Sequence, residues 1–392
     1  MSPEPSEDRP GREALGRALT AGGALTPDWA PAFAAVPRSA FLPDLIWPFD
    51  MRTGRSTAVS KATAPTAWHR YADAEDAPIV TQWDDGQHPG PEPGREATSS
   101  LSMPSVVFRM LRDLDVRPTH RVLEIGTGTG WNAALLAHRA GKGNVTSIEI
   151  DETVAFTART ALDRFGAPVH VIHGDGALGH PAGAPYDRII ATCGLRSVPY
   201  AWVTQCRPGG IILAPWGTHY GAGDAVARLI VSEDGKTASG GFTGPVEFMK
   251  LRAQRRPPVP HKDYVPGSVS EGDESSTALT EDQFVGTRFS PLQFVLGLRI
   301  RDCAQVLADK RDGGRPVWLY GLTDRSWACA WFRDGAPTRV WQSGARRLWE
   351  EAEEAYGWWV GHGRPGHGRF GLTVTGEGER VWVDEPSRSW SL

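Results

Sequence analysis

Three alternating glycines stand between an apolar stretch and a run of small and aliphatic residues in RVLEIGTGTGWNAALLA, residues 121–137. Residues 122–125 are predicted to form a buried strand and residues 131–139 a helix. The glycines are Gly126, Gly128 and Gly130. Without a Cβ they let a ligand approach the backbone, and the start of the helix offers N–H groups without partners. The segment predicts a site for a nucleotide-like ligand; a tight turn that binds nothing is the alternative.

Two acidic residues lie near the carboxyl ends of the next two predicted strands. Glu149 lies 23 positions after Gly126, in the strand at 144–150, and Asp175 follows the strand at 170–173. An acid after the second strand can accept hydrogen bonds from ribose hydroxyls, and one after the third strand can accept from an adenine amino group. The glycine spacing misses the dinucleotide fingerprint G-x-G-x-x-G by one position. The pattern therefore argues against a dinucleotide.

Strands and helices alternate from residue 122 to residue 231. Such alternation predicts right-handed crossovers and a mostly parallel sheet, with the ligand beyond the carboxyl ends of the strands. Ahead of it, residues 44–75 are expected to be irregular, and the Ser/Thr cluster at 98–103 with Pro104 is expected to start a helix. Residues 244–254 are expected to form one more strand.

The pattern E-x-G-x-G-x-G, which begins at Glu124, resembles motif I of S-adenosylmethionine (SAM) methyltransferases. Together with Glu149 and the Asp175-Gly176 turn, this resemblance implies SAM as the cofactor and S-adenosylhomocysteine as its product. The fold implied is α/β: the Rossmann-like sheet of a class I SAM methyltransferase, with an N-terminal extension and a smaller C-terminal α+β domain.

Further segments resemble the protein L-isoaspartyl methyltransferases. SSLSMPSVV, at 99–107, resembles their T-I-S-x-P segment, and VPRSAFLP, at 36–43, resembles their V-P-R-x-x-F-x-P. APYDRIIATC with VPYAWVTQCRPGGIILAPWG resembles their fourth and fifth strands, and PVEFMKL their closing strand. The sequence departs from the family at Val107, where a His is common, at Lys250-Leu251-Arg252, where P-L-T is usual, and in the long loop at 84–97.

The resemblance implies a set of site residues. Ser102 is the implied catalytic residue, as a hydrogen-bond donor to one oxygen of the substrate carboxylate; its alternative role is to cap the helix at 105–114. No metal site is expected, because the histidines lack metal-ligand spacing. The implied cofactor contacts are Ser99, Ser100, Leu101, Ser102, Glu124, Gly126, Thr127, Gly128, Thr129, Gly130, Asn132, Glu149, Ile150, Asp175, Gly176 and Thr192.

The 392 residues are expected to form four parts. Residues 1–97 are the N-terminal extension with a lid or substrate region, and 98–255 the methyltransferase domain. Residues 256–276, rich in Pro, Ser and charge, are expected to be a linker. Residues 277–392 are an α+β domain, expected to recognise a peptide, and a capping box is predicted at Thr280 and Gln283.

Composition excludes several classes. A net charge of −4 argues against a nucleic-acid partner, and no apolar run is long enough for a transmembrane helix. The N-terminus has no apolar signal core, so a cytoplasmic location is expected. The four cysteines form no C-x-x-C pair and are expected to be reduced. A monomer is the favoured state.

The C-terminal segments WLYGLTDRSWACAWF and ARRLWEEAEEAYGWW resemble methyltransferases that accompany ATP-grasp peptide maturation (graspetide) systems, whose relatives accompany lanthipeptide and lasso-peptide pathways. This resemblance implies O-methylation of an Asp in a modified, crosslinked precursor peptide, leading to aspartimide or isoaspartate. The alternatives are an enzyme that repairs isoaspartyl sites in proteins and a catalytically silent SAM-fold module that presents a peptide.

Overall fold

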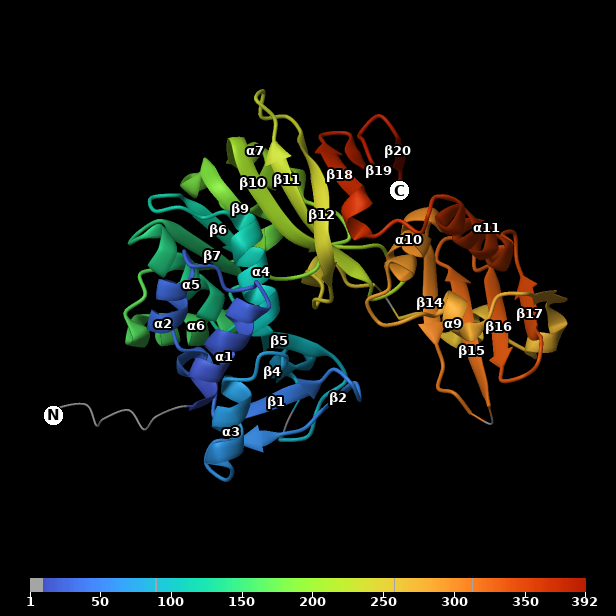
Figure 1. Ribbon diagram of the computed structural model, residues 1–392, viewed down its shortest axis with the longest axis horizontal. Coiled ribbons are helices and arrows are strands. Elements are labelled where there is room, and N and C mark those ends of the chain that lie inside the picture. The colour runs from blue at the N-terminus through green and yellow to red at the C-terminus, as the bar shows by residue number, and fades with distance from the viewer. Residues whose placement is uncertain (1–9, 89, 257, 312) are drawn as a thin grey trace. The chain divides into compact units, whose positions relative to one another are not determined.

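A computed structural model describes residues 10–88, 90–256, 258–311 and 313–392 (Figure 1). The chain divides into two compact units. Unit 1 consists of Met1–Cys193, Pro199–Leu213 and Arg228–Ala238, and unit 2 of Gly194–Val198, Ala214–Ala227 and Ser239–Leu392. The units are therefore interleaved along the sequence rather than joined by one linker.

Unit 1 is built on a mostly parallel sheet, as predicted. β6 lies between β7 and β9, β8 pairs with β7, and β10 pairs with β9, all in parallel (Figure 1). β11 follows beside β10, and both strands also contribute residues to unit 2. The strands are β6 (Val122–Ile125), β7 (Val145–Glu149), β8 (His170–His173), β9 (Tyr186–Ala191), β10 (Cys206–Trp216) and β11 (Asp224–Val231). Because β6 and β9 are almost wholly buried, apolar residues predominate in both, although Glu124 interrupts β6 and Asp187 and Arg188 interrupt β9.

Helices connect the strands of this sheet. α5 follows β6, and α6 follows β7 with Asp151 as its N-cap, accepting from the Val154 N–H at 3.0 Å. Gly166 ends α6 in the left-handed conformation. The helices of unit 1 are α1 (Pro10–Ala21), α2 (Ala30–Ala35), α3 (Pro65–Ala72), α4 (Pro104–Leu114), α5 (Trp131–Ala140), α6 (Glu152–Phe165) and α7 (Tyr200–Gln205). The α/β fold class is confirmed.

The N-terminal part of unit 1 carries a second sheet that sequence patterns do not predict. Its strands are β1 (Leu45–Asp50), β2 (Arg55–Ser56), β3 (Val59–Ser60), β4 (Ile79–Trp83) and β5 (Ala97–Leu101). The expectation of irregular structure at 44–75 is wrong, because β1 pairs with β2, β3 and β4. Residues 97–101 form a strand paired with β4, and the helix begins only at Pro104.

The long loop between β4 and β5 is closed by Asp84. Its carboxylate accepts from the N–H groups of Arg95 and Glu96 at 3.0 and 2.8 Å, and Trp47 Nε1 donates to the Pro91 carbonyl at 2.6 Å. These bonds hold the loop against the N-terminal sheet.

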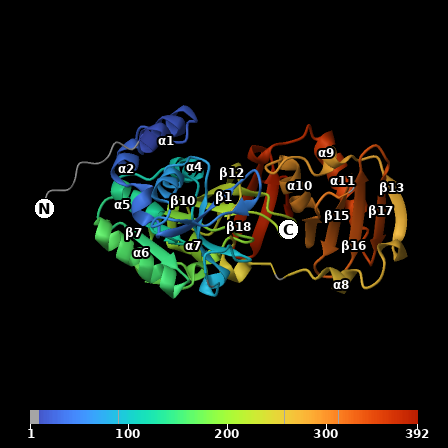
Figure 2. The same ribbon diagram turned by 90° about the horizontal axis from the view of Figure 1, so that it is seen from below.

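Unit 2 contains an antiparallel sheet in the order β13-β17-β16-β15-β14. Its strands are β13 (Asp273–Thr277), β14 (Cys303–Leu307), β15 (Gly314–Gly321), β16 (Trp327–Arg333) and β17 (Thr338–Ser343). Helices α9 (Glu281–Phe284), α10 (Pro291–Arg299) and α11 (Leu348–Gly361) cover one face, and the segment with α8 (His261–Tyr264) covers the other (Figure 2). Part of the expected linker is thus strand β13. The capping box of Thr280 and Gln283 is confirmed at the start of α9.

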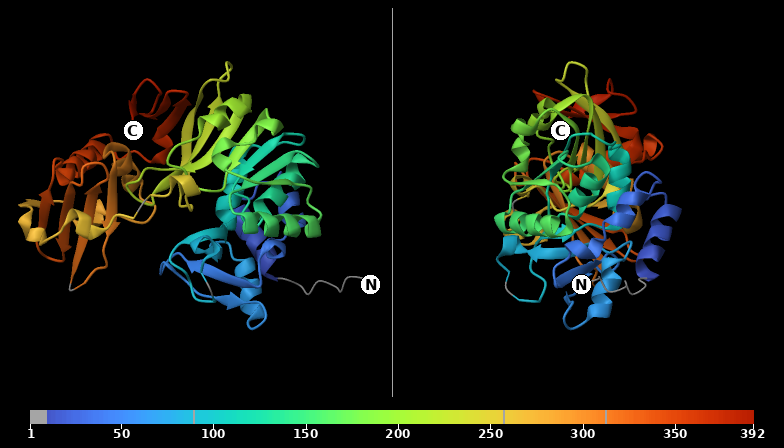
Figure 3. Two further views of the ribbon diagram at one scale, coloured as in Figure 1. Left: turned by 180° about the vertical axis from the view of Figure 1, so that it is seen from behind. Right: turned by 90° about the vertical axis from the view of Figure 1, so that its left-hand side faces the viewer.

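A second group of strands in unit 2 lies in the order β12-β18-β19-β20 (Figure 1). In Figure 3, β12 is yellow and the other three strands are red. The strands are β12 (Ala238–Val246), β18 (Phe370–Thr375), β19 (Gly378–Val383) and β20 (Ser389–Ser391). The expectation of a strand over 244–254 is wrong beyond Val246, where the chain leaves β12; Lys250 makes only an isolated bridge with Gly194. Within the described part of the chain, none of the helices has the length and apolarity needed to cross a bilayer.

Candidate active site

The glycine loop after β6 has a backbone that other residues rarely adopt. Gly126, Gly128 and Gly130 have φ values of +92°, +54° and +91°. The Gly126 N–H donates to the Ile148 carbonyl at 2.8 Å, which holds the loop against β7. A Cβ on Gly126 would lie 2.9 Å from Thr192 Oγ1, and that hydroxyl donates to the carbonyls of Ile125 and Gly126. The loop is therefore fixed from both neighbouring strands.

Glu124 lies beneath this loop with no exposed surface. Asn132 Nδ2 donates to its carboxylate at 2.7 Å and Ser147 Oγ at 2.5 Å, and Ser147 Oγ also lies 2.6 Å from Thr127 Oγ1. Burial raises the pKa of Glu124 to about 7, although both hydrogen bonds act in the opposite direction. Glu124 thus joins β6, β7 and the first turn of α5 from inside.

Glu124→Gln is expected to remove a pH dependence of stability. The folded pKa of about 7 lies above the ordinary 4.5, so this contribution to stability is complete below pH 4.5 and is lost as the pH rises through 7. Relative to the Gln variant, the wild type should lose about 3 kcal/mol of unfolding free energy between mildly acidic and mildly alkaline pH. Urea unfolding of both proteins across this range measures the difference; a constant difference would contradict the assignment.

Glu149, at the end of β7, is the second acid of the site. Its carboxylate accepts from the Gly128 N–H at 2.9 Å and from the Asp151 N–H at 3.2 Å. Burial raises its pKa, and the Gly128 hydrogen bond opposes this rise. Since a carboxylate has about four acceptor positions, two remain for the hydroxyls of a ligand.

Asp175 and Ile150 flank the same edge of the sheet. Asp175 is exposed, and its carboxylate accepts from the Ala177 N–H at 2.9 Å, closing a turn after β8. A Cβ on Gly176 would lie 2.4 Å from Ile125 Cγ2, so this glycine allows the turn to pack against β6. Ile150 is 38 % exposed, which leaves an apolar side chain for a base to contact.

Ser99–Ser102 runs from the end of β5 to the start of α4, beside the glycine loop. A Cβ on Gly128 would lie 3.5 Å from the Ser100 carbonyl oxygen. The N-cap of α4 is Met103, and no side chain caps this helix. Ser102 is partly exposed, and its hydroxyl makes no hydrogen bond to any described residue. Its alternative role as a helix cap is therefore not observed, and the hydroxyl is available to a ligand.

Arg38, from the VPRSAFLP segment, holds this junction from inside. It is 3 % exposed, and its Nη2 donates to the carbonyls of Ala77, Leu101 and Ser102 at 2.8, 3.1 and 2.9 Å. Its Nη1 contacts the carbonyls of Tyr71, Ala72 and Ala74 at 3.2 to 3.4 Å. Burial lowers the pKa of Arg38 to about 9, and Asp73 opposes this.

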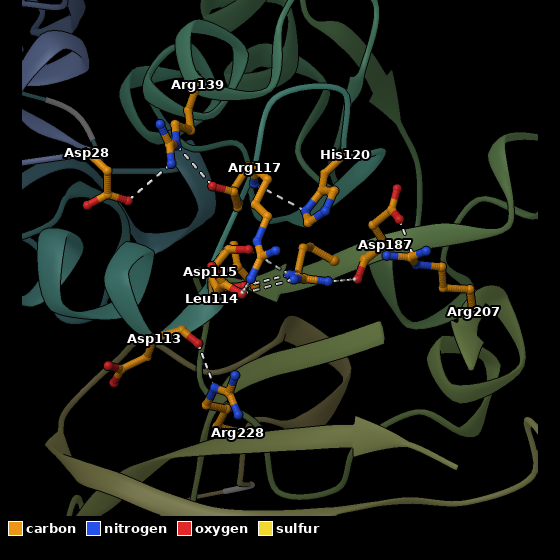
Figure 4. Close-up of polar contacts among 12 residues, drawn as sticks. Asp28, Asp113, Leu114, Asp115, Arg117, His120, Arg139, Asp187, Arg207 and Arg228 are labelled. Atoms are coloured by element: carbon orange, nitrogen blue, oxygen red, sulfur yellow. Dashed lines mark hydrogen bonds and ion pairs between the residues drawn. The ribbon is translucent and has the colours of Figure 1, made fainter. Parts of the chain in front are cut away.

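The other end of α4 is anchored by arginines (Figure 4). Arg188 Nε donates to the Leu114 and Asp115 carbonyls at 2.7 and 3.0 Å. Arg228 Nε donates to the Asp113 carbonyl at 2.7 Å, as Figure 4 shows. Both arginines lie on strands of the parallel sheet. Since both ends of α4 are held, the position of Ser102 is fixed relative to the sheet within unit 1.

The structure brings the sequence-predicted residues together along one edge of the sheet. They fall into two groups, one buried and one with exposed surface. Some lie mainly inside and shape the loop: Ser99, Leu101, Glu124, Thr127, Gly130, Glu149 and Gly176. Others keep exposed surface: Ser100, Ser102, Gly126, Gly128, Thr129, Asn132, Ile150, Asp175 and Thr192. Sequence reasoning missed the contributions of Arg38 and Ser147. A charged residue inside the otherwise mostly apolar VPRSAFLP was the available signal for Arg38.

Comparisons with known proteins bear on the same region. Residues 87–252 match the family model described as protein-L-isoaspartate(D-aspartate) O-methyltransferase (PCMT). A protein-L-isoaspartate O-methyltransferase of Pyrococcus horikoshii is 45 % identical over 141 residues, covering 36 % of this chain and 63 % of that protein. Protein-L-isoaspartate O-methyltransferase 2 of Archaeoglobus fulgidus is 38 % identical over 161 residues, covering 40 % and 70 %.

A solved structure of a protein-L-isoaspartate O-methyltransferase shares the fold, with a TM-score of 0.53 and 20 % identity over 95 % of this chain and all of that one. The chain spans 57 to 64 % of the length of the first four curated relatives, but more than two thirds of the Archaeoglobus protein. The glycine loop, Glu149, Asp175 and Ser102 all fall inside the matched region. This chain belongs to the protein-L-isoaspartate O-methyltransferase family.

Proposed function

We propose that this chain binds SAM and transfers its methyl group to a carboxylate of an aspartyl or isoaspartyl residue. The residues fit the cofactor: the glycine backbone leaves an open approach, Glu149 keeps two acceptor positions for a ribose, and Ile150 offers apolar surface to a base. The observation that carries the transferase proposal is the Ser102 hydroxyl, unbonded among the described residues and held beside the glycine loop by Arg38.

SAM, when bound, supplies a methyl group on a sulfonium, which is transferred without an external base. A carboxylate is already a nucleophile, so the residues of the chain position it rather than deprotonate it. Ser102 donates to one carboxylate oxygen and leaves the other free. Positioning of this kind can lower a barrier by about 7–11 kcal/mol. Arg38 keeps the Ser102 backbone in place through a carbonyl 2.9 Å away.

Ser102→Ala is expected to lower kcat by about 10- to 100-fold, because a hydrogen bond to a charged group contributes about 1.5–3 kcal/mol. The dissociation constant of SAM, measured by calorimetry, should change little. Ser105→Ala, at the second residue of α4, is the matched control. Unchanged turnover in Ser102→Ala would remove the proposed role.

The substrate we propose is an Asp in a modified, crosslinked precursor peptide. The backbone amide nitrogen that follows this Asp attacks the methyl ester, loses its proton and displaces methanol, which gives an aspartimide. Addition of water to the aspartimide then gives isoaspartate. Support comes from residues 253–392, which lie beyond the family match, and from the C-terminal segments that resemble the graspetide-associated enzymes. The closing-strand change to Lys250-Leu251-Arg252 also points to a substrate contact unlike that of the repair enzymes. Methylation of isoaspartyl sites in damaged proteins is the second candidate, favoured by the names of the curated relatives.

One assay separates these functions. The full-length protein is incubated with SAM and either an L-isoaspartyl peptide or a crosslinked precursor, and the products are analysed by mass spectrometry. A methyl gain on the isoaspartyl peptide favours repair, and a loss of water at one Asp of the precursor favours peptide tailoring. If SAM is not consumed with either substrate, both functions fail, and the remaining interpretation is a catalytically silent module that only binds a peptide.

A further inference from the structure

A cluster of charged side chains in unit 2 lies outside the site described above. Arg196, Asp224, Lys250 and Arg256 form it, and we call it the basic cluster. Lys250 Nζ donates to one oxygen of the Asp224 carboxylate, and Arg196 Nη1 lies 3.5 Å from the other. Arg256 Nη1 donates to the His219 carbonyl at 2.8 Å. Two cations therefore share the Asp224 carboxylate, and Arg256 acts through space on one of them, Arg196.

The positive charge of the basic cluster exceeds its negative charge. Glu247 also acts on Asp224 and Lys250 through space, but its carboxylate is paired with Arg288 at 2.8 Å. The pKa of His219 is lowered by burial and by the neighbouring cations, so its ring adds no charge at neutral pH. An anion entering the cluster would meet uncompensated cations.

Two buried nitrogen atoms of this region, Arg196 Nε and His219 Nδ1, have no hydrogen-bond partner among the described residues. Asp224 Oδ1 accepts no hydrogen bond there either, but it is ion-paired with Arg196 Nη1 at 3.5 Å. Unpaired buried groups are rare in native structures and call for an explanation. The side chains of Arg196 and Lys250 are 14 % and 12 % exposed, whereas that of Asp224 is not exposed. Solvent thus reaches the cations but not the carboxylate that they share.

The backbone that carries Arg196 is fixed. Gln254 Oε1 accepts from the N–H groups of Arg196 and Ser197 at 2.6 and 3.1 Å, and its Nε2 donates to the Ser197 carbonyl at 2.8 Å. Glu379 accepts from the Val198 N–H and from Trp216 Nε1. A guanidinium held in this way is pre-organised, so less entropy is lost when it binds a carboxylate.

We propose that the basic cluster is a subsite for a second carboxylate of the peptide substrate, distinct from the one that is methylated. An arginine fork matches the geometry of a carboxylate. The subsite rests on the proposed function, because a peptide substrate is assumed. The carboxylate comes from an Asp or Glu side chain or from the peptide C-terminus.

The test uses a panel of labelled isoaspartyl hexapeptides with amidated C-termini. These peptides form pairs that differ only in having Glu or Gln at one position, and this position is varied from pair to pair. One further pair differs only in having a free or an amidated C-terminus. Full-length wild type, Arg196→Gln, Arg256→Gln and Arg196→Lys are compared in methyl transfer and in peptide binding by fluorescence anisotropy. Arg339→Gln is the control, an exposed cation that pairs with Glu274 elsewhere in unit 2.

For the wild type, we expect one pair to show a preference: its acidic peptide should have a KM and a Kd about tenfold lower than its neutral partner. The acidic group of this pair is either the Glu at one scanned position or the free C-terminus. Arg196→Gln and Arg256→Gln should abolish this ratio, Arg196→Lys should keep part of it, and Arg339→Gln should keep all of it. Equal values for every pair in the wild type, or variants that weaken both peptides equally, would overturn the subsite and leave a structural ion cluster. If no peptide of the panel is methylated, the repair of isoaspartyl sites fails, whereas methylation of the crosslinked precursor is decided by its own assay and the Kd ratio still decides the subsite.

Discussion

Arg38→Met is expected to destabilise the protein by about 3 kcal/mol or more. The guanidinium donates hydrogen bonds to three carbonyls at 2.8 to 3.1 Å and contacts three more at 3.2 to 3.4 Å. Methionine fills a similar volume but donates no hydrogen bond, so these buried carbonyls lose their partner at about 1–3 kcal/mol each. Two of them belong to Leu101 and Ser102, so activity should fall more than the folded fraction does.

Urea unfolding measures the stability change, and kcat measured under conditions where the variant stays folded separates positioning from unfolding. The stability of Arg38→Lys should lie between that of the wild type and that of Arg38→Met, because an ammonium has three donors where the guanidinium has five. Arg70→Met removes an exposed arginine of α3 and should change stability by less than about 0.5 kcal/mol. A loss below about 1 kcal/mol in Arg38→Met would mean that water replaces the guanidinium at these carbonyls.

Glu149→Gln is expected to weaken binding of SAM and S-adenosylhomocysteine by about 100-fold. The carboxylate accepts from Gly128 and Asp151 and can accept two further hydrogen bonds. In the Gln variant an NH2 group, which only donates, replaces one carboxylate oxygen. This NH2 would lie opposite either a backbone N–H or a ribose hydroxyl, and the hydrogen bond that the oxygen accepted there would be lost. Two weakened hydrogen bonds at about 1.5 kcal/mol each correspond to this loss.

Calorimetry with S-adenosylhomocysteine at neutral pH gives the affinity, and Glu152→Gln, exposed in the first turn of α6, is the control. Since burial raises the pKa of Glu149, the wild type should itself lose affinity as the pH falls and the carboxyl takes up a proton. If the affinity is insensitive to both pH and substitution, the ribose is not bound by Glu149.

The parallel sheet is predicted well from sequence because each strand and each helix carries its own local signal. β6 is apolar except for Glu124, β7 and β8 each contain two aliphatic residues, and α6 has a capping Asp at its start and a glycine at its end. The edge at which Glu149 and Asp175 meet follows from this alternation, since parallel strands end at the same side.

The N-terminal sheet could not be predicted in the same way. β2 and β3 have two residues each and exist only through pairing with β1. β5 is ATSSL, and its Ser/Thr content favours a helix cap when only neighbouring residues are considered. Arg38 likewise finds its partners 33 to 64 positions further along the chain, a distance that no periodic pattern reports.

The interleaving of the two units has a consequence for synthesis and for engineering. Unit 1 lacks part of its chain until the ribosome has added Ala238, although residues 194–198 and 214–227 of unit 2 are made before that point. Those two stretches cannot complete unit 2 until Ser239–Leu392 has been translated. Neither unit can therefore finish folding as one uninterrupted N-terminal segment. A chimera that exchanges unit 2 between relatives must therefore replace three stretches of sequence, because one fusion point near residue 255 would leave unit 2 with parts of two parents.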